Sequence, residues 1–374
     1  MKKDPPCSDI DSCCGQESVK APAQPCCPPG HWQLKSLLTP AGLVPRVRTD
    51  LQFADRLGAV KARLGINRMN YKIAPGLYAV GNPTKDSPVL VSANYKMSFD
   101  HLRSSMAGRD AWIMVLDTEG INVWCAAGKG TFGTEEILRR ISATNLDKIV
   151  AHRTLILPQL GAPGVAAHQV KERSGFRVVY GPIRAKDLPA FLDAGMKAAP
   201  EMRRVTFTFR ERLVLVPMEL VLGPKYLLLF LVALFFLGGL GRGGYSLHNA
   251  LTTGSVAVTL GVLGFLGGAA ITPLLLPWLP GRPFSVKGAA VGVVIALAYA
   301  GYRFNGVEGA GSVLEVLPWF FILPAVAAFF AMNFTGASTY TSLSGVKREM
   351  RFAVPAQVAG LLVGMGLWVV GHFV

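Results

Sequence analysis

The feature that most constrains the fold of this chain is a change of composition near residue 215. Before that point charged residues alternate with short apolar runs, whereas after it charges almost disappear. The second part contains five apolar segments of 17–24 residues: 225–241, 254–277, 286–302, 313–332 and 353–371. A helix of about 20 apolar residues is long enough to cross the hydrocarbon core of a bilayer. The sequence therefore predicts a water-soluble domain followed by a five-helix transmembrane domain.

Basic residues predict how these helices are oriented. The segments 280–287 and 333–352 carry Arg282, Lys287, Lys347, Arg348 and Arg351, whereas the other two connections carry only Arg242 and Arg303. Positively charged connections stay in the cytoplasm. The first eleven residues contain no apolar stretch that resembles a secretory signal. We therefore expect a multi-pass protein of the cell inner membrane, with its soluble domain in the cytoplasm and its C-terminus outside.

The net charge of +15 has a simple explanation in this setting. A basic cluster directly precedes the first apolar segment and consists of Arg203, Arg204, Arg210 and Arg212. Arginines in such a position attract the anionic headgroups of membrane lipids. No RNA-binding aromatic pattern or zinc-finger spacing accompanies the charge. The sequence therefore predicts membrane lipids as partners and no nucleic acid.

Three regions are expected along the chain. Residues 1–30 are rich in Pro and Cys and predict a disordered tail, residues 31–215 predict an α/β domain, and residues 216–374 predict the transmembrane domain. Residues 70–80 and 88–93 resemble two paired strands.

The α/β domain has an alternating pattern of elements. Strands are expected at 111–116, 148–157 and 176–180, and helices at 134–141, 162–173 and 187–196. Such alternation is typical of a parallel, doubly wound (Rossmann-like) sheet. A ligand of such a sheet lies at the carboxyl ends of the strands, here among the loops 117–133, 158–164 and 181–186.

The segment from Asn122 to Thr131, NVWCAAGKGT, lies in the first of these loops and admits three interpretations. Gly128, Gly130 and Gly133 form a G-x-G-x-x-G pattern, but no acidic residue ends the next strand to hold a ribose. A phosphate-binding P-loop would need Gly in place of Val123 and Ser or Thr in place of Gly130. The two nucleotide-binding interpretations are therefore poorly supported.

The third interpretation concerns Cys125. A free cysteine is commonly a small buried apolar residue. Here, however, Ala126, Ala127 and Gly128 remove bulk beside the thiol, and the helix start that follows favours a thiolate. Such a surface can lie flat against a large planar macrocycle such as a corrin. The pattern D-x-H-x-x-G, which supplies a cobalt-ligating His, is absent from the chain.

At these residues the chain resembles the membrane-bound corrinoid proteins of anaerobic mercury methylation, which are relatives of the corrinoid iron–sulfur protein of acetyl-CoA synthesis. The family signature N-(V/I)-W-C-A-(A/G)-G-K, in a cap-helix region under the corrin, is met in full by residues 122–129. The resemblance implies that Cys125 is the lower axial ligand of cobalt. It also implies that the corrin rests on Asn122, Val123, Trp124, Ala126, Ala127, Gly128 and Lys129.

The resemblance further implies an activity and partners. The chain would be a corrinoid-dependent methyltransferase that passes a methyl group from cobalt to mercury(II) and forms methylmercury. Its partners would be a ferredoxin-like protein with two [4Fe–4S] clusters and a methyl donor of the folate pathway. The alternative is a membrane-anchored corrinoid protein that methylates or transports another soft metal or substrate.

Other residues complete the set of candidates. Gly161 and Gly164 in the loop 158–164 are expected at the edge of the corrin, because glycines allow close backbone contact. The tail pairs Cys13-Cys14 and Cys26-Cys27 are candidates for mercury capture, since mercury prefers thiolates, or belong to a tail without function. His152 and His168 lie in or beside the predicted ligand loops and are expected to be structural.

Overall fold

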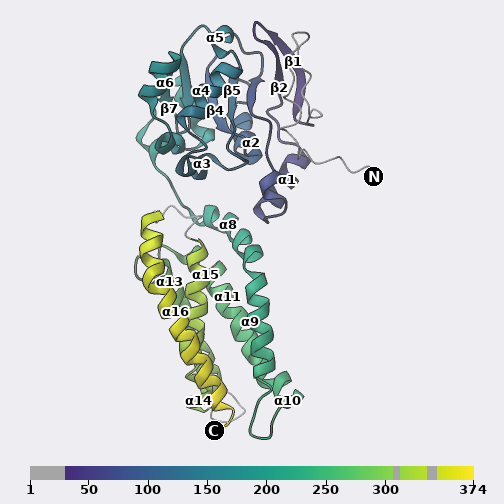
Figure 1. Cartoon of the computed structure of the whole chain (residues 1–374), viewed down its shortest axis with the longest axis vertical. Helices are drawn as coiled ribbons and strands as arrows, with labels where there is room; N and C mark the ends of the chain where they lie inside the picture. The colour runs from purple at the N-terminus through teal and green to yellow at the C-terminus, as the bar shows by residue number, and fades with distance from the viewer. Residues whose placement is uncertain (1–29, 306–311, 335–342) are drawn as a thin grey trace, which may run out of the picture. The chain divides into compact units, whose positions relative to one another are not determined.

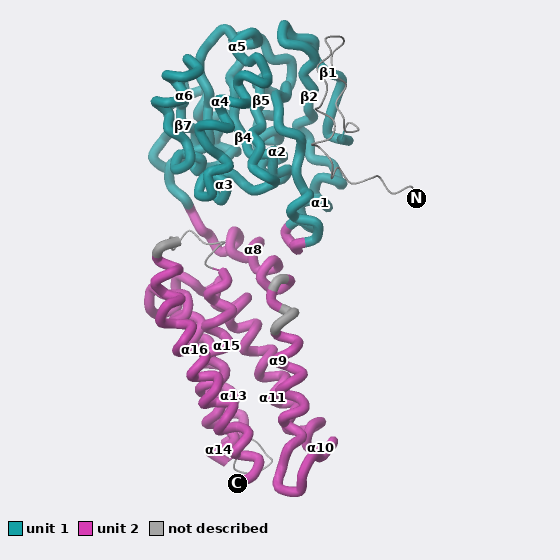
Figure 2. The backbone as a smooth tube through the Cα atoms, in the orientation of Figure 1, with its two compact units in different colours: residues 1–62, 66–205 teal, residues 63–65, 206–374 magenta. Residues whose placement is uncertain are grey.

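The computed structural model describes residues 30–305, 312–334 and 343–374, apart from the side chains of residues 222, 224–226, 343 and 344. The chain divides into two compact units (Figures 1 and 2). The first consists of Met1–Ala62 and Ile66–Val205, and the second of Arg63–Gly65 and Thr206–Val374. The tail cysteines Cys13, Cys14, Cys26 and Cys27 lie outside the described residues.

The first unit is built on a mixed seven-stranded sheet of the order β1-β2-β3-β5-β4-β6-β7. The strands are β1 (Gln33–Thr39), β2 (Gly42–Val47), β3 (Gly76–Val80), β4 (Val89–Ala93), β5 (Ala111–Leu116), β6 (Thr154–Leu157) and β7 (Arg177–Tyr180). Strands β5, β4, β6 and β7 run parallel to one another, whereas β1 pairs with β2 and β3 with β5 in antiparallel fashion. The α/β class is confirmed, but the expectation of a wholly parallel sheet is wrong.

The expected pairing of residues 70–80 with 88–93 is also wrong. β3 pairs with β5, and β4 lies between β5 and β6. All five residues of β4 are buried. A strand that is buried throughout, with a continuous apolar run, is typical of the centre of a parallel sheet rather than of a hairpin.

Helices cover both faces of the sheet. They are α1 (Phe53–Arg63), α2 (Lys96–Ser105), α3 (Val123–Lys129), α4 (Thr134–Ala143), α5 (Leu146–Ile149), α6 (Ala167–Ser174) and α7 (Leu188–Asp193). The sheet therefore has one apolar core on each face, and the side chains of β5 alternate between them. Trp112, Met114 and Leu116 pack with α3, α4, α5 and α6, while Ile113 and Val115 pack with α2 and α7.

Several expected boundaries move because of local chemistry. The expected strand 148–157 begins as α5 and becomes extended only at Thr154. The expected helix 162–173 is a 3₁₀ segment, η2 (Gln159–Gly164), followed by α6. Pro163 and Gly164 account for this break, since both are poor residues for a continuous α-helix. The expected helix 187–196 is η3 (Ala185–Asp187) followed by α7, with Gly195 beyond its end in the left-handed conformation (φ 66°). The remaining 3₁₀ segments of this unit are η1 (Arg68–Asn70) and η4 (Pro200–Arg203).

The sheet order determines where a ligand would bind. The chain leaves β4 for β5 on one side of β4, and then crosses to β6 on its other side. In an open α/β sheet, the carboxyl edge at such a reversal forms a crevice that binds ligands. At this edge β5 is followed by the segment that leads to α3, and β6 is followed by η2.

The second unit is helical. Its helices are α8 (Phe209–Leu222), α9 (Pro224–Leu237), α10 (Leu247–Asn249), η5 (Ala250–Gly254), α11 (Ser255–Leu266), η6 (Gly267–Ile271), α12 (Thr272–Leu275), α13 (Phe284–Asn305), α14 (Val313–Val316), α15 (Trp319–Asn333) and α16 (Leu343–Gly371). Among the described residues, four helical stretches are long and apolar enough to cross a membrane: Leu247–Leu275, Phe284–Asn305, Val313–Asn333 and Gly345–Gly371. In the first expected span, 225–241, the described residues include the shorter apolar helix Leu227–Leu237, which is part of α9. The count of five spans stays a prediction.

Candidate functional site

A buried asparagine fixes the turn that leads to the motif. Asn94 follows β4 and is 2% exposed. Its Oδ1 accepts hydrogen bonds from the backbone N–H of Thr118 (3.2 Å), from the Thr118 hydroxyl (2.9 Å) and from the backbone N–H of Gly120 (2.9 Å). Its Nδ2 donates to Asp117 Oδ1 at 3.0 Å. These bonds stabilise a turn in which Glu119 and Gly120 have φ values of 57° and 75°. Asn94 therefore sets the direction in which the chain enters α3.

Cys125 lies in the first turn of α3, inside the segment 117–133 that the sequence predicts as a ligand loop. Asn122 caps this helix, because its Oδ1 accepts a hydrogen bond from the Cys125 backbone N–H at 2.9 Å. Such a cap satisfies a donor that would otherwise be unpaired at the helix start. Gly130 ends the helix in the left-handed conformation (φ 87°). The Asn and the Gly on either side of the motif thus define a helix of 7 residues.

The two faces of α3 differ sharply. Ala126 and Ala127 are buried, with exposed fractions of 0% and 5%, and belong to the core under the sheet. On the outer face Trp124 is 38% exposed, Cys125 is half-buried, and Gly128 and Lys129 are exposed. The expectation that both alanines line the surface beside the thiol therefore differs from the structure. Only Gly128 leaves that surface bare, since a Cβ atom there would meet nothing within 4 Å.

The glycines of η2 explain why the alanines are inside. A Cβ atom on Gly164 would lie 2.2 Å from the Phe132 carbonyl oxygen and 3.0 Å from Ala127 Cα. A Cβ atom on Gly161 would lie 2.5 Å from Cε1 of the Phe132 ring. Both glycines therefore allow η2 to pack directly on α3 and on the residues that follow it. Their contact with the edge of a cofactor stays a prediction.

The donor set at this site limits which metals it can hold. Within the residues that the structure describes, Cys125 is the single free cysteine. The same residues contain no group of three or more His, Cys, Asp or Glu side chains that could hold a metal ion. A metal bound by the Cys125 sulfur would thus not have a complete set of protein ligands among these residues, and most of its ligands would have to come with it. A metal inside a planar macrocycle meets this condition.

Both histidines mentioned above are placed by the structure. His152 precedes β6, at its amino end, and not at the carboxyl edge where the ligand loops were expected. Its Nδ1 accepts a hydrogen bond from the Thr154 N–H (3.2 Å), so Nε2 carries the proton and donates to the Ser87 carbonyl (2.9 Å). His168 is exposed on α6. His152 therefore has a structural role, as expected, but the expected position is wrong.

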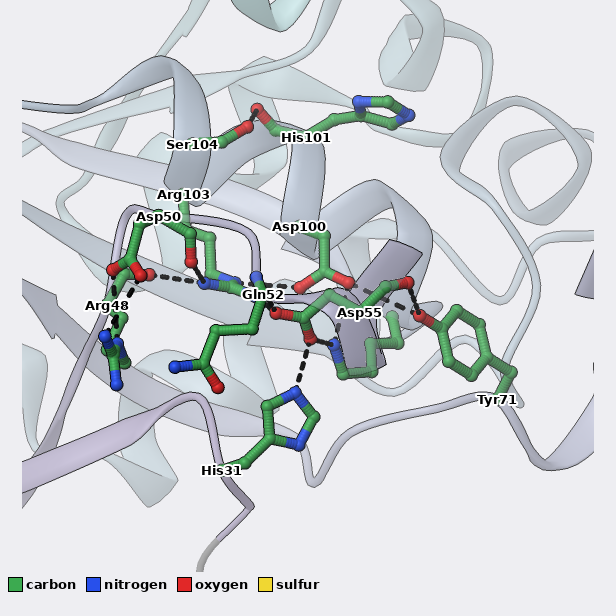
Figure 3. A network of polar contacts seen from close by, with 11 residues as sticks. His31, Arg48, Asp50, Gln52, Asp55, Tyr71, Asp100, His101, Arg103 and Ser104 are labelled. Atoms are coloured by element: carbon green, nitrogen blue, oxygen red, sulfur yellow. Dashed lines mark hydrogen bonds and ion pairs between the residues drawn. The ribbon is translucent and has the colours of Figure 1, made fainter. Parts of the chain in front are cut away.

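A buried ion-pair network stabilises the start of α2 (Figure 3). Lys96 Nζ contacts Asp55 Oδ1 at 2.5 Å and Asp100 Oδ2 at 2.7 Å. Arg103 contacts the other oxygens of the same two carboxylates, at 2.9 and 2.8 Å. Two positive and two negative charges are thus paired, which a buried ionic group requires. Because the network joins α1 to α2, it holds the crossover that begins at β4. No sequence pattern pointed to it.

The network changes the protonation of its members. Burial acts to raise the pKa of Asp55, but the hydrogen bond and charge of Lys96, together with Arg103, outweigh this effect and hold that pKa well below its usual range. Burial, with the nearby carboxylates of Asp100 and Asp55, raises the pKa of Tyr71. The carboxylate of Asp55 is therefore ionised and Tyr71 is neutral at physiological pH.

Comparison with known proteins connects this domain to one group of enzymes. A family model described as CO dehydrogenase/acetyl-CoA synthase delta subunit matches residues 67–192, which include α3 and η2. The gamma subunit of the acetyl-CoA decarbonylase/synthase complex of Methanopyrus kandleri is 32% identical over 33% of this chain and 26% of its own length. The corresponding subunit of Archaeoglobus fulgidus is 28% identical over 34% of this chain and 27% of its own length.

The residues that the family model matches lie in the first unit, and the chain spans about a quarter of the length of these relatives. The family that the matches define binds a corrinoid, which agrees with the cofactor expected from the sequence. Residues 67–192, with Cys125 at their centre, are therefore related to the corrinoid-binding subunits of CO dehydrogenase/acetyl-CoA synthase.

Proposed function

We propose that this chain is a membrane-anchored corrinoid protein that passes a methyl group from cobalt to mercury(II) and forms methylmercury. The observation that carries the proposal is the position of Cys125. Its thiol lies on the outer face of a capped helix, at the carboxyl edge of the sheet, and the described residues contain no group of three or more side chains that could hold a metal ion. The relationship of residues 67–192 to corrinoid-binding subunits supports the same cofactor.

The residues of α3 fit a corrin in three respects. Cys125 would hold the metal of the cofactor through its sulfur, and the macrocycle would bring most of the other ligands. Gly128, one turn further along the helix, leaves open space where a side chain would hold a flat ring away from the sulfur. The exposed indole of Trp124 offers apolar surface to the macrocycle. Asn94 and Asn122 act as positioning residues, because they hold the turn and the helix that present the thiol.

The chemistry follows from what the cysteine donates. When bound, a corrinoid supplies a cobalt that can carry a methyl group and release it. Mercury(II) is an electrophile and takes the methyl group together with its bonding electrons. Cys125 as a thiolate would donate more electron density to the bound metal than an imidazole would. A thiolate ligand thus favours transfer to an electrophile.

The second unit and the partners complete the proposal. We assign the apolar helices to a cell inner membrane, with the first unit in the cytoplasm and the C-terminus outside, on the basis of helix length and the distribution of basic residues. A ferredoxin-like protein with two [4Fe–4S] clusters and a methyl donor of the folate pathway are the partners that the motif resemblance suggests. The tail cysteines are proposed to assist mercury capture without being essential.

The proposal is tested by replacing Cys125 with Ala in cells that carry the gene. The variant trades a half-buried thiol for a methyl group, so the protein should accumulate normally, while methylmercury formation should fall to the background of cells without the gene. Replacement of Cys13, Cys14, Cys26 and Cys27 by Ser is the matched control and should retain part of the activity. Wild-type methylmercury formation by an equal amount of the Cys125→Ala protein would contradict the thiolate mechanism.

Measuring the corrinoid content of the purified protein beside methylmercury formation by the cells tests the cofactor and the methyl acceptor separately. The relatives are subunits of acetyl-CoA decarbonylase/synthase complexes, so they support a corrinoid protein of methyl transfer without indicating mercury. If the purified wild-type protein carries a corrinoid but the cells form no methylmercury, the methyl group passes to another soft metal or substrate.

A further inference from the structure

A cavity of about 890 Å³ lies within the second unit, between α13, α15 and α16. Its walls are mostly apolar and include Phe320, Phe321, Pro324 and Ala328. Its rim carries Arg282 and Arg348. We propose that this cavity binds one anionic phospholipid, with the phosphate at the two guanidinium groups and an acyl chain along the apolar wall. The inference rests on the proposed membrane insertion of this unit and is independent of mercury and of the corrinoid.

The charges at the rim favour an anion. Arg282 and Arg348 are exposed, and in the part of the chain that the structure describes neither has an ion-pair partner. The third ionisable group in the lining, Glu349, is engaged, because its Oε1 accepts a hydrogen bond from the Ser285 backbone N–H at 2.6 Å. Two guanidinium groups beside one engaged carboxylate leave a net positive rim. Guanidinium groups bind phosphate through paired hydrogen bonds.

A second observation comes from inside the cavity. Gln357 lines it and is 9% exposed, and among the residues that the structure describes its Oε1 has no hydrogen-bond partner. Its Nε2 donates to the Met332 sulfur at 3.2 Å. A buried amide oxygen without a donor is unfavourable, so the site calls for a polar group from a ligand. As oriented, Oε1 can accept a hydrogen bond from a hydroxyl. After a half-turn of the amide, Nε2 would face the cavity in its place and would donate to an ester carbonyl.

The spacing of these groups matches an amphipathic molecule. Arg348 and Gln357 are nine residues apart on α16, which is about 13 Å along a helix axis. The cavity is thus cationic at its rim, polar at one deeper point and apolar elsewhere. A free phosphate would satisfy the arginines but leave the apolar wall without contacts. A phospholipid satisfies all three regions through its phosphate, its glycerol esters and its acyl chain.

The expected orientation of the chain supplies a source for this ligand. Arg282 and Arg348 belong to the two connections that the distribution of basic residues predicts on the cytoplasmic side. The cytoplasmic leaflet contains anionic lipids, and basic pockets between transmembrane helices bind their headgroups. The rim therefore faces the membrane surface where its ligand is present.

The test measures lipids retained by the purified full-length protein. Protein in detergent is mixed with phosphatidylglycerol or phosphatidylcholine and examined by native mass spectrometry. Wild type should retain one phosphatidylglycerol and prefer it at least tenfold over phosphatidylcholine. The double variant Arg282→Gln/Arg348→Gln should lose this preference, and Gln357→Leu should weaken retention of phosphatidylglycerol at least threefold. The control Lys347→Gln/Arg351→Gln removes two neighbouring charges outside the cavity and should behave as wild type.

Three results would overturn the inference: equal retention of the two lipids by wild type, an equal loss of preference in the control, or competition by inorganic phosphate at the concentration of the lipid. Helical circular dichroism of each variant shows that the second unit is folded. Corrinoid content is measured on the same samples. Corrinoid without lipid preference contradicts only this inference, whereas lipid preference without corrinoid contradicts only the proposed cofactor.

Discussion

Gly128 offers the clearest test of how a flat ligand reaches Cys125. Its position on the outer face of α3 is open, since a Cβ atom there would meet no protein atom within 4 Å. Gly128→Phe should therefore leave the folded domain intact, with a free energy of unfolding within about 1 kcal/mol of wild type. The introduced phenyl ring would stand between the corrin and the sulfur. We expect corrinoid affinity to fall at least tenfold, as measured by titration of the purified domain.

Gly128→Ala is the matched control for this substitution. A methyl group extends little from the helix, and Ala stabilises a helix relative to Gly by about 0.5–1 kcal/mol. Affinity close to wild type in the alanine variant, with a large loss in the phenylalanine variant, is the expected pair of results. If both variants bind corrinoid as wild type does, the ring does not lie over this face of α3.

At the residue scale, the sequence motif gives a hypothesis about chemistry but does not predict which of its residues are buried. The motif around Cys125 pointed to the thiol without any structural information. The positions of Ala126 and Ala127 could not be predicted in the same way, because their burial depends on η2, a segment more than 30 residues away that approaches through Gly161 and Gly164. Asn94 was missed for a similar reason, since its partners lie more than 20 residues away in the chain, in the turn after the neighbouring strand β5. A polar residue directly after a buried strand was the available signal.

At the scale of elements, the ion-pair network that joins α1 to α2 should make the first unit less stable at acid pH. The pKa of Asp55 in the folded protein lies below its ordinary value of 3.8. The unfolded chain therefore binds this proton more readily, and the stability that the carboxylate contributes is fully present above about pH 4 and decreases as pH falls below it. We expect urea unfolding of the first unit to show this decrease between about pH 4 and pH 2.5.

The substitution Lys96→Met tests whether this network causes the loss of stability in acid. This substitution leaves two carboxylates beside one arginine in a buried site, and it should cost about 3–5 kcal/mol near neutral pH. The stability of the variant should also decrease less steeply as the pH falls, because protonation of a carboxylate that has lost Lys96 removes an unpaired buried charge. An unchanged acid dependence in the variant would show that other carboxylates determine it.

Helices and strands were predicted correctly where the local sequence pattern was strong. The apolar strand 111–116 and the helix start at Thr134 are where the sequence placed them. The partner of β3 was not predictable from neighbouring sequence, because strand pairing depends on burial on both faces. In the apolar run 225–241, helix α9 ends at Leu237 and glycines follow it. Whether this run crosses a membrane stays a prediction.

The division of the whole molecule into two units predicts that the first one folds alone. Its two cores consist of residues between Trp32 and Met202. A fragment of residues 31–205 should therefore be recovered in the soluble fraction and should bind a corrinoid after reconstitution. Co-purification of the corrinoid is measured by absorption spectroscopy. A fragment that is folded by circular dichroism but binds no corrinoid would contradict the assignment of the cofactor to this unit.

The most direct test of the account is the absorption spectrum of the full protein with bound corrinoid, compared between wild type and Cys125→Ala. If the Cys125 sulfur binds cobalt, the two proteins should contain similar amounts of corrinoid, since most contacts with the ring are unchanged. The visible bands of the wild type should nevertheless be shifted from those of the variant, and Cys125→His should give a third spectrum. Identical spectra of wild type and Cys125→Ala, at equal corrinoid content, would contradict the claim that this thiol is the cobalt ligand.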